Sequence, residues 1–269
     1  MQAIAKEMNF SETTFVLPAE APGTDARMRI FTPAEELPTA GHPTIGTTFA
    51  LARAGVIARG RTSYVFGCGI GPVSVALTWN GDDLAFVWMT QALPVFSEAV
   101  VDPGRVAAAL SLTPETVAAT GHPPQVVACG VPFLFVPLAT RRVVDQVAVN
   151  QAALGALLHE TQPAAHGVFV FAAEPAGSDV TVYSRMFAPE LGVVEDPATG
   201  IASGPLGSYL VRHRIVDQKA AQAMISLQGA KMGRPSHVHI AIGVEKSEIA
   251  GVRVGGEAVL AGEGTLYVS

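Results

Sequence analysis

The amino-acid sequence predicts an α/β protein of two similar halves, each wrapping a sheet around a buried helix. Three observations carry this prediction. Many short segments have β-strand character, two helical segments are apolar nearly all round, and a pattern of strand, turn and helix occurs twice. At 269 residues the chain is long enough for two domains, and its 49% hydrophobic content supplies a substantial core.

Alternation and β-branched enrichment predict strands along the whole chain. These strands are expected over Thr14–Leu17, Met28–Phe31, Ser63–Phe66, Val73–Thr78, Leu84–Met89, Gln125–Val127, Phe133–Pro137, Val168–Ala172, Val180–Phe187, Ile225–Gln228, Val238–Ile242, Val252–Val254 and Glu257–Ala261. Helices are expected over Met1–Met8, Thr44–Ala54, Arg105–Leu110, Gln151–His159 and Ile201–His213. The second and the last are mostly apolar, which is typical of buried helices.

A Pro-rich stretch without periodicity, Leu93–Pro103, is the predicted linker. It divides the chain into an N-terminal lobe, residues 1–97, and a C-terminal lobe, residues 98–269. Two alternatives stay open at this point. The last strand could return to the N-terminal lobe, and that lobe could lack its first strand.

The internal repeat begins with the pattern R-apolar-F-x-P, found at Arg29–Pro33 and again at Arg185–Pro189. Each copy leads to a Gly-containing turn, 39–43 and 195–200, and then to a buried helix. A match this short can arise by chance, but the shared order favours duplication. Two helix N-termini would then occupy corresponding places, where free N–H groups attract anions such as carboxylates.

Composition excludes several classes of function. The formal net charge of −6 argues against nucleic acid as a partner. No apolar run is long enough to span a membrane, and no signal peptide is visible. Two cysteines, Cys68 and Cys129, cannot form a disulfide framework and fit a reducing, cytoplasmic location. No metal or cofactor motif is found.

Three polar residues, Glu12 between a helix end and a strand and two others at the predicted turns, are candidates for chemistry. Glu12 is either a surface loop residue or a partly buried general base, whose pKa burial would raise toward neutrality. His42 precedes the first buried helix and either caps a turn or transfers protons; a helix N-terminus would favour its neutral form. Asp196 opens the second turn, where capping and orientation of a reacting group are compatible.

Other motifs are better explained structurally. The segment 67–71 is Gly-rich, but a strand follows it, so it predicts a hairpin and not a dinucleotide loop. Ser203 lacks the G-x-S-x-G pattern of a hydrolase. His237 and His239 alternate along a strand and would point to opposite faces, which disfavours a shared metal.

Four segments resemble the phenazine-biosynthesis PhzF family: 9–17 (NFSETTFVL), 29–46 (RIFTPAEELPTAGHPTIG), 184–206 (SRMFAPELGVVEDPATGIASGPL) and 228–236 (QGAKMGRPS). The resemblance implies a diaminopimelate-epimerase-like fold of two pseudo-symmetric lobes, each a curved, mostly antiparallel sheet around a central helix. It also implies a homodimer and isomerisation of a small carboxylate without a cofactor.

Residue roles follow from the same resemblance. Glu12 matches the proton-shuttling glutamate, while His42 and Asp196 match the other catalytic positions. Ser11, Gly41, Gly200, Ile201 and Ala202 are the expected substrate-binding residues. Relatives of this fold that epimerise amino acids use two cysteines, which this chain lacks at the turns.

Two departures from the family pattern are visible. Ile201 replaces a serine of the family's T-G-S-A, which removes a hydroxyl and adds bulk. Family members also carry roughly thirty more residues before the equivalent of Met1, so either the sequence is truncated or its first lobe is reduced. A cofactor-independent isomerase is therefore expected. The alternative is a non-catalytic metabolite-binding or interaction protein on the same scaffold.

Overall fold

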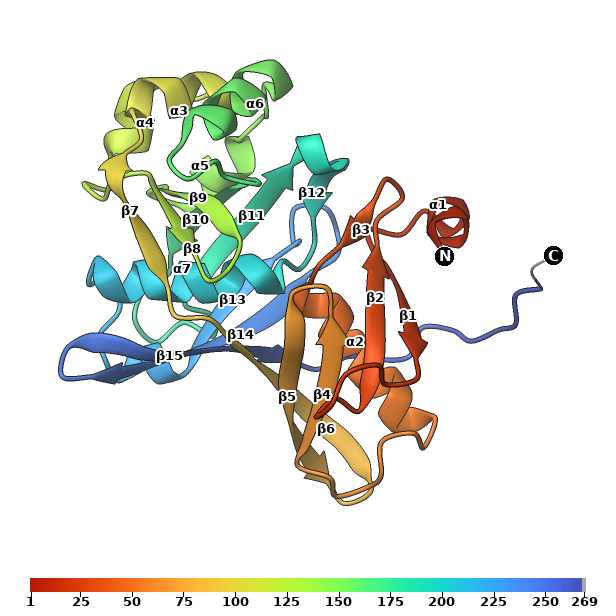
Figure 1. Cartoon of the computed structure of the whole chain (residues 1–269). Helices are drawn as coiled ribbons and strands as arrows, with labels where there is room; N and C mark the ends of the chain where they lie inside the picture. The colour runs from red at the N-terminus through yellow and green to blue at the C-terminus, as the bar shows by residue number, and fades with distance from the viewer. Residues whose placement is uncertain (268–269) are drawn as a thin grey trace.

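One continuous sheet runs through both halves of the molecule (Figure 1). The computed structural model describes residues 1–267, apart from the side chains of residues 99, 100 and 191. The strand order is β1-β2-β4-β5-β6-β15-β14-β13-β11-β10-β9-β8-β7, and β3 and β12 pair separately with β2 and β11. Most neighbouring strands are antiparallel; β2/β4, β9/β10 and β11/β13 are parallel. The mixed α/β architecture agrees with the predicted fold class.

The strands are β1 Thr13–Leu17, β2 Ala26–Phe31, β3 Glu36–Leu37, β4 Ser63–Cys68, β5 Gly71–Asn80, β6 Asp83–Gln91, β7 Val95–Val100, β8 Gln125–Ala128, β9 Pro132–Pro137, β10 Val168–Ala173, β11 Val182–Ala188, β12 Val193–Asp196, β13 Met224–Gln228, β14 Ser236–Glu245 and β15 Glu248–Gly256. The α-helices are α1 Gln2–Met8, α2 Gly41–Arg53, α3 Pro103–Leu110, α4 Pro114–Ala118, α5 Arg141–Gln146, α6 Gln151–Glu160 and α7 Gly200–Arg212. Two short 3-10 helices are η1 Pro189–Leu191 and η2 Ala220–Gln222. Across residues 1–267, no helix combines the length and apolar character of a membrane span.

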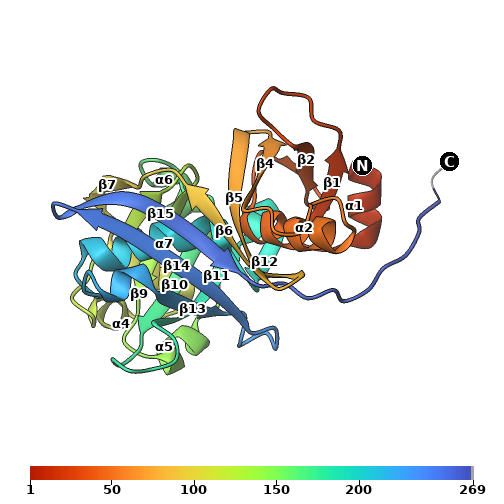
Figure 2. The same ribbon diagram turned by 90° about the horizontal axis from the view of Figure 1, so that it is seen from below.

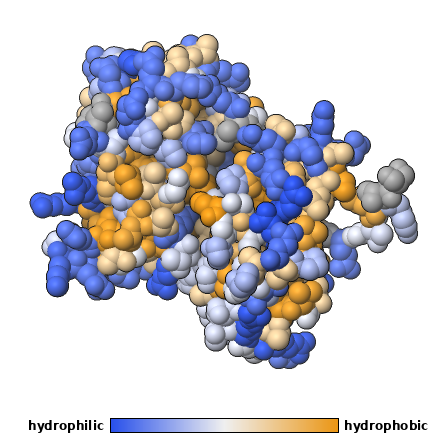
Figure 3. Space-filling model, viewed as in Figure 1, coloured by the Kyte–Doolittle hydropathy of each residue, from blue (hydrophilic) through white to orange (hydrophobic). Residues whose placement is uncertain are grey.

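Two sequence predictions are wrong. The predicted linker contains β7, which pairs with β8 at the edge of the sheet. Ser97 and Glu98 interrupt the apolar pattern, so this strand cannot be recognised from the sequence. It forms because it pairs with a neighbouring strand and not because of its own residue pattern. Leu93 and Val95 remain exposed there, and Figure 3 shows apolar residues gathered over this edge.

The strand predicted over Glu257–Ala261 is not formed. The residues after β15 leave the body beside the first half of the molecule in both views (Figures 1 and 2). Val259 is 92% exposed. The alternation is therefore present in the sequence, but the described structure gives this segment no neighbouring strand to pair with.

The internal repeat is confirmed in the structure. Its two copies form β2 with β3 and β11 with β12, each an antiparallel pair, followed by the 13-residue helices α2 and α7. Arg29 forms a two-pronged ion pair with Glu36, and Arg185 does the same with Glu195. The Arg29 guanidinium also lies 5.1 Å from the ring centre of Phe31.

In the second copy the corresponding distance from Arg185 to Phe187 is 4.7 Å. Each glutamate stands five residues before the glycine that starts its helix. Shared contacts of this kind are not expected from a chance match of five letters. The shared contacts therefore favour duplication over chance as the origin of the repeat.

The buried core is divided between the two halves. One apolar cluster, which includes Met28, Phe66 and Val87, surrounds α2. All of its residues come from the stretch of chain that starts with β2 and ends with β6. Two further clusters contain residues from beyond position 95, and one of them packs Leu206 and Tyr209 of α7 against the sheet. Each central helix therefore has its own core. The division of the chain near residue 97 stays a prediction.

The two central helices meet at their N-termini. A Cβ added to Gly41 would lie 2.6 Å from the Cα of Gly200, and one added to Gly200 would lie 3.0 Å from the Cα of Gly41. Both neighbours are backbone atoms, so neither can move away as a side chain does. Glycine at both positions lets the two helix ends come this close.

We expect Gly41→Ala to destabilise the fold, because the methyl group would have to separate the two helices. Overpacking of this kind typically costs about 1–3 kcal/mol. Gly46→Ala in the same helix is the matched control, since nothing lies within 4 Å of its added Cβ. The control should be neutral or more stable by up to about 1 kcal/mol. Chemical denaturation of both variants measures the difference, and equal stabilities would contradict the close contact.

Candidate active site

A small cavity of about 70 Å³ lies at the meeting point of the two helices. Glu12, His42 and Asp196 all line it, so the structure brings together three candidates of which the first and last are 184 residues apart in the sequence. Threonines supply further polar groups, and an apolar wall completes the cavity. The residues of that wall are Leu37, Ala40, Phe133, Met186, Ala188, Val193 and Ile201.

Glu12 and His42 form a close pair on one side of the cavity. Glu12 lies in the turn between α1 and β1, and His42 is the second residue of α2. The Nε2 atom of His42 lies 3.0 Å from Oε2 of Glu12. The Glu12 side chain is only 11% exposed, whereas that of His42 is 36% exposed. A carboxylate with little access to water thus lies directly beside an imidazole.

The pair reverses the pKa shifts expected from the sequence. Burial raises the pKa of Glu12, but contact with His42 and with the Ser11 side chain outweighs it and leaves that pKa below 4.5. Burial lowers the pKa of His42, but Glu12 and, more weakly, Asp196 outweigh it and leave that pKa above 6.5. The expectations of a raised glutamate pKa and a neutral histidine are therefore wrong. A single sequence position does not reveal the direction of either pKa shift, because each shift depends on the contact between Glu12 and His42.

Asp196 stands on the other half of the repeat, at the end of β12, and only 4% of it is exposed. Burial raises its pKa, whereas the His42 charge and the Thr199 hydroxyl lower it; the net shift is upward from 3.8. Thr199 donates a 2.6 Å hydrogen bond to Oδ2 of Asp196. The cavity therefore holds two carboxyl groups in unlike environments, one with a lowered and one with a raised pKa. Environments of this kind suit different roles in proton transfer.

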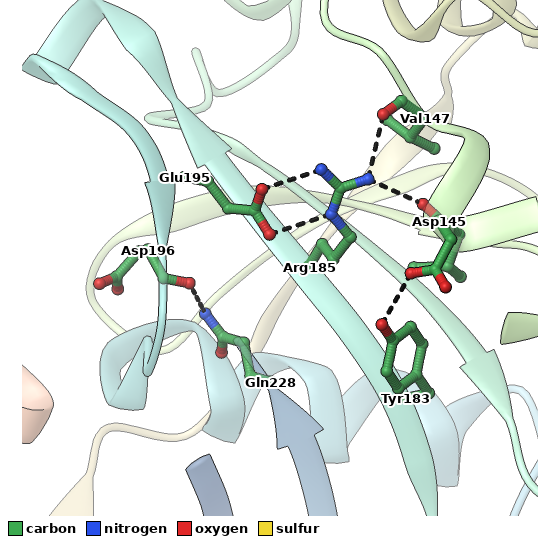
Figure 4. Close-up of polar contacts among 8 residues, drawn as sticks. Asp145, Val147, Tyr183, Arg185, Glu195, Asp196 and Gln228 are labelled. Atoms are coloured by element: carbon green, nitrogen blue, oxygen red, sulfur yellow. Dashed lines mark hydrogen bonds and ion pairs between the residues drawn. The ribbon is translucent and has the colours of Figure 1, made fainter. Parts of the chain in front are cut away.

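A buried ion pair fixes the strand that carries Asp196 (Figure 4). Arg185 of β11 contacts both carboxylate oxygens of Glu195, at 3.0 and 2.8 Å. It also donates to the carbonyl oxygens of Val144 and Val147. The Arg185 side chain is 9% exposed, and these acceptors offset the loss of hydration of its guanidinium. Because Glu195 directly precedes Asp196, the pair holds β12 against β11 next to the cavity.

The remaining predicted residues are only partly brought to the cavity. Gly41, Gly200 and Ile201 line it, and Ser11 contacts Glu12. Ala202 lies in the core instead, and its amide donates to the carbonyl oxygen of Thr199. That N–H is therefore already satisfied within the helix end.

The motifs set aside from the sequence have structural roles. Ser203 is fully buried and donates its hydroxyl to the carbonyl of Thr199. Burial raises the pKa of Cys68 to about 11 and that of Cys129 to about 12, so both remain neutral thiols at neutral pH. Within residues 1–267, no three His, Cys, Asp or Glu side chains are grouped so that they could hold a metal ion.

The sequence did not single out Thr199 and Gln228, which support Asp196. Gln228, the last residue of β13, is fully buried and bonds to the backbone of both Asp196 and Thr199. The available signal was the segment 228–236, which resembles the family without showing what its first residue contacts. The apolar wall was also missed, except for Ile201.

Comparison with known proteins places these features in context. The model of the family described as phenazine biosynthesis-like protein (PhzC-PhzF) matches residues 1–264. The trans-2,3-dihydro-3-hydroxyanthranilate isomerase of Pseudomonas aeruginosa is 35% identical, over all of this chain and 88% of its own length. An uncharacterised isomerase of Mesorhizobium japonicum is 34% identical with the same coverage. A crystal structure of a PhzF-family protein from Bacillus anthracis covers 95% of this chain and 84% of its own, with 26% identity and a TM-score of 0.81.

We expect Glu12→Gln to lower the pKa of His42, because the variant removes the negative charge 3.0 Å from its ring. The shift should be about one pH unit. NMR titration of the histidine rings measures it. His239, whose lowered pKa has causes other than Glu12, serves as the internal control. An unchanged His42 titration would contradict the pairing.

The same pair predicts how stability depends on pH. The contribution of Glu12 is present above pH 4.5 and is lost as the pH falls through its lowered pKa. The contribution of His42 is fully present below pH 6.5 and is lost as the pH rises through its raised pKa. The pair should therefore stabilise wild type over Glu12→Gln most between pH 4.5 and 6.5. Chemical denaturation at several pH values checks this, and a difference that does not vary with pH would contradict it.

Proposed function

Since the chain belongs to the PhzC-PhzF family of phenazine biosynthesis-like proteins and is an isomerase, we propose that it moves a proton within a small carboxylate-bearing metabolite without a cofactor. One observation carries the proposal. Glu12 and His42, whose side chains lie 3.0 Å apart, face a small cavity that Asp196 also lines, at the meeting point of two helix N-termini.

The reaction needs one base that also returns the proton. Glu12, ionised at neutral pH, takes a proton from an activated C–H bond of the substrate and becomes a carboxylic acid. The electron pair left by that bond shifts through the substrate, and Glu12 then protonates a different carbon. Atoms and electrons balance within one molecule, so the step needs no oxidant or reductant. General acid–base catalysis of this kind contributes about 10²–10⁴-fold.

His42 and Asp196 have supporting roles in this scheme. His42, in contact with Glu12, stabilises the carboxylate before the proton arrives and remains hydrogen-bonded to the carboxylic acid afterwards, without changing its own protonation. Asp196 faces the substrate from the other half of the repeat, where its raised pKa suits it to hold or share a proton. The N-terminal ends of α2 and α7 supply partial positive charge, which favours a substrate carboxylate.

The cavity itself indicates what kind of substrate fits. Its volume of about 70 Å³ is smaller than a drug-sized ligand site, and seven of its lining side chains are apolar. We propose a compact carboxylate with an apolar side that packs against Ile201 and Phe133. The homodimer and the cytoplasmic location that the sequence suggests stay predictions.

Glu12→Gln should abolish incorporation of solvent deuterium into the substrate, while binding changes by about tenfold or less. Proton NMR in D₂O tests this with a panel of small carboxylates that includes trans-2,3-dihydro-3-hydroxyanthranilate. Glu7→Gln, at an exposed position of α1, is the matched control and should exchange like wild type. Undiminished exchange in Glu12→Gln would remove Glu12 from the mechanism. Binding by wild type without exchange across the whole panel would favour the non-catalytic alternative.

Ile201→Ser should increase turnover of trans-2,3-dihydro-3-hydroxyanthranilate relative to that of compact aliphatic carboxylates. The change removes branched bulk from the cavity wall and restores a hydroxyl that the family resemblance places there. A pocket contact of this size alters the ratio of kcat/KM values by roughly 10–100-fold. Ile215→Ser, a partly buried isoleucine beyond α7 that does not line the cavity, is the control. An unchanged ratio would show that Ile201 does not select the substrate.

A further inference from the structure

We propose that Gln228 is a positioning residue for Asp196 and acts through the hydroxyl group of Thr199. The inference rests on the proposed function, in which Asp196 belongs to the active site. Gln228 ends β13, one strand away from β11 and outside the cavity lining. It therefore affects the chemistry only through the groups that it holds.

The orientation of the Gln228 amide is fixed by its partners. Its Oε1 accepts a 3.0 Å hydrogen bond from the backbone N–H of Thr199, which can only donate. Its Nε2 donates over 2.7 Å to the carbonyl oxygen of Asp196, which can only accept (Figure 4). If the amide were flipped, its NH₂ group would face the N–H of Thr199 and its oxygen would face the carbonyl oxygen of Asp196, so neither hydrogen bond could form. The assignment of oxygen and nitrogen is thus unambiguous.

The second N–H of Gln228 sets the direction of the Thr199 hydroxyl. Nε2 lies 2.8 Å from Oγ1 of Thr199, so this oxygen accepts from the amide. The hydroxyl has a single hydrogen, which is then directed to Oδ2 of Asp196, 2.6 Å away. A chain of donation therefore runs from Gln228 through Thr199 to Asp196.

This chain makes the two oxygens of Asp196 unequal. Oδ2 receives the Thr199 hydroxyl, whereas Oδ1 is buried and has no hydrogen-bond partner among the described residues. Because Asp196 lines the cavity, Oδ1 is the oxygen left for the substrate or for a proton. Gln228 thereby selects which atom of the carboxyl group is available.

The charged groups around Asp196 act in both directions. His42 from α2 stabilises its negative charge, and Glu12, from the turn before β1, opposes it. Arg185 contacts both carboxylate oxygens of Glu195, so the positive and negative charges of this pair neutralise each other. Two neutral groups counter the burial of Asp196 by hydrogen bonding, the Thr199 side chain and the backbone of Ala198, and Thr199 is the stronger influence on its pKa. Gln228 holds the Thr199 hydroxyl in place.

A control for general loss of structure exists on the same strand. Ser226 of β13 is also fully buried, and its hydroxyl lies 2.9 Å from that of Ser184 on β11. Ser226→Ala removes a buried hydrogen bond from β13 and leaves Thr199 and Asp196 untouched. An effect that comes only from weakening the strand should appear in this variant too.

The experiment is a pH titration of Asp196 by ¹³C NMR in protein labelled at the aspartate carboxyl carbons, with Asp196→Asn for assignment. Thr199→Val should raise the midpoint of Asp196 by about one pH unit, because the ionised form loses a donor. Gln228→Met should raise it similarly, and the double variant should add little further. Thr199→Ser should keep the wild-type midpoint, as should Ser226→Ala.

Three results would overturn the proposal. One is an unchanged midpoint in Gln228→Met; another is fully additive shifts in the double variant. The third is an equal shift in Ser226→Ala, which would indicate a purely structural role. The titration needs no substrate, so it is independent of the proposed isomerisation. If wild type exchanges deuterium, the kcat of Gln228→Met should fall by more than its KM changes, and the acidic limb of its rate profile should move upward.

Discussion

The contact between the N-termini of α2 and α7 is the constraint on which the site depends. Backbone meets backbone at Gly41 and Gly200, so the distance between the two halves is fixed at this point. His42 and Ile201 follow these glycines directly, and their positions in the cavity are a result of it. Gln91 of β6 strengthens the same junction by donating to the carbonyl oxygen of Gly200. The continuous sheet supports this junction through β6 and β15.

Electrostatics then separates the roles of similar groups. Glu12 and Asp196 are both carboxylic acids with little exposure, yet one has a lowered pKa and the other a raised one. The difference follows from their partners, since a basic ring contacts Glu12 directly, whereas the closest donor to Asp196 is a neutral hydroxyl. Burial alone would have shifted both in the same direction.

Much of the fold could be predicted from the sequence, because buried strands and helices leave periodic patterns. The apolar segments around α2 and α7 and the R-apolar-F-x-P repeat are examples. β7 could not be found, since its order depends on β8, and the segment after Gly256 shows that alternation without a partner forms no strand. For the candidate site, single positions in the sequence suggested Glu12, His42 and Asp196, but the directions of their pKa shifts depend on the groups that the fold places beside them. Gln228 acts through contacts 29 and 32 residues away, which no local pattern reveals.

The duplicated architecture has a consequence for how a ligand can lie in the cavity. Leu37 and Asp196 each stand four residues before the helix glycine, and His42 and Ile201 each stand one residue after it. All four line the cavity, so at both pairs of related positions one copy is polar and the other apolar. A pocket with true two-fold equivalence would accept a molecule in two orientations of equal energy. Because the two copies have diverged, the two orientations no longer have equal energy. The protein therefore favours one orientation of a bound molecule over the other.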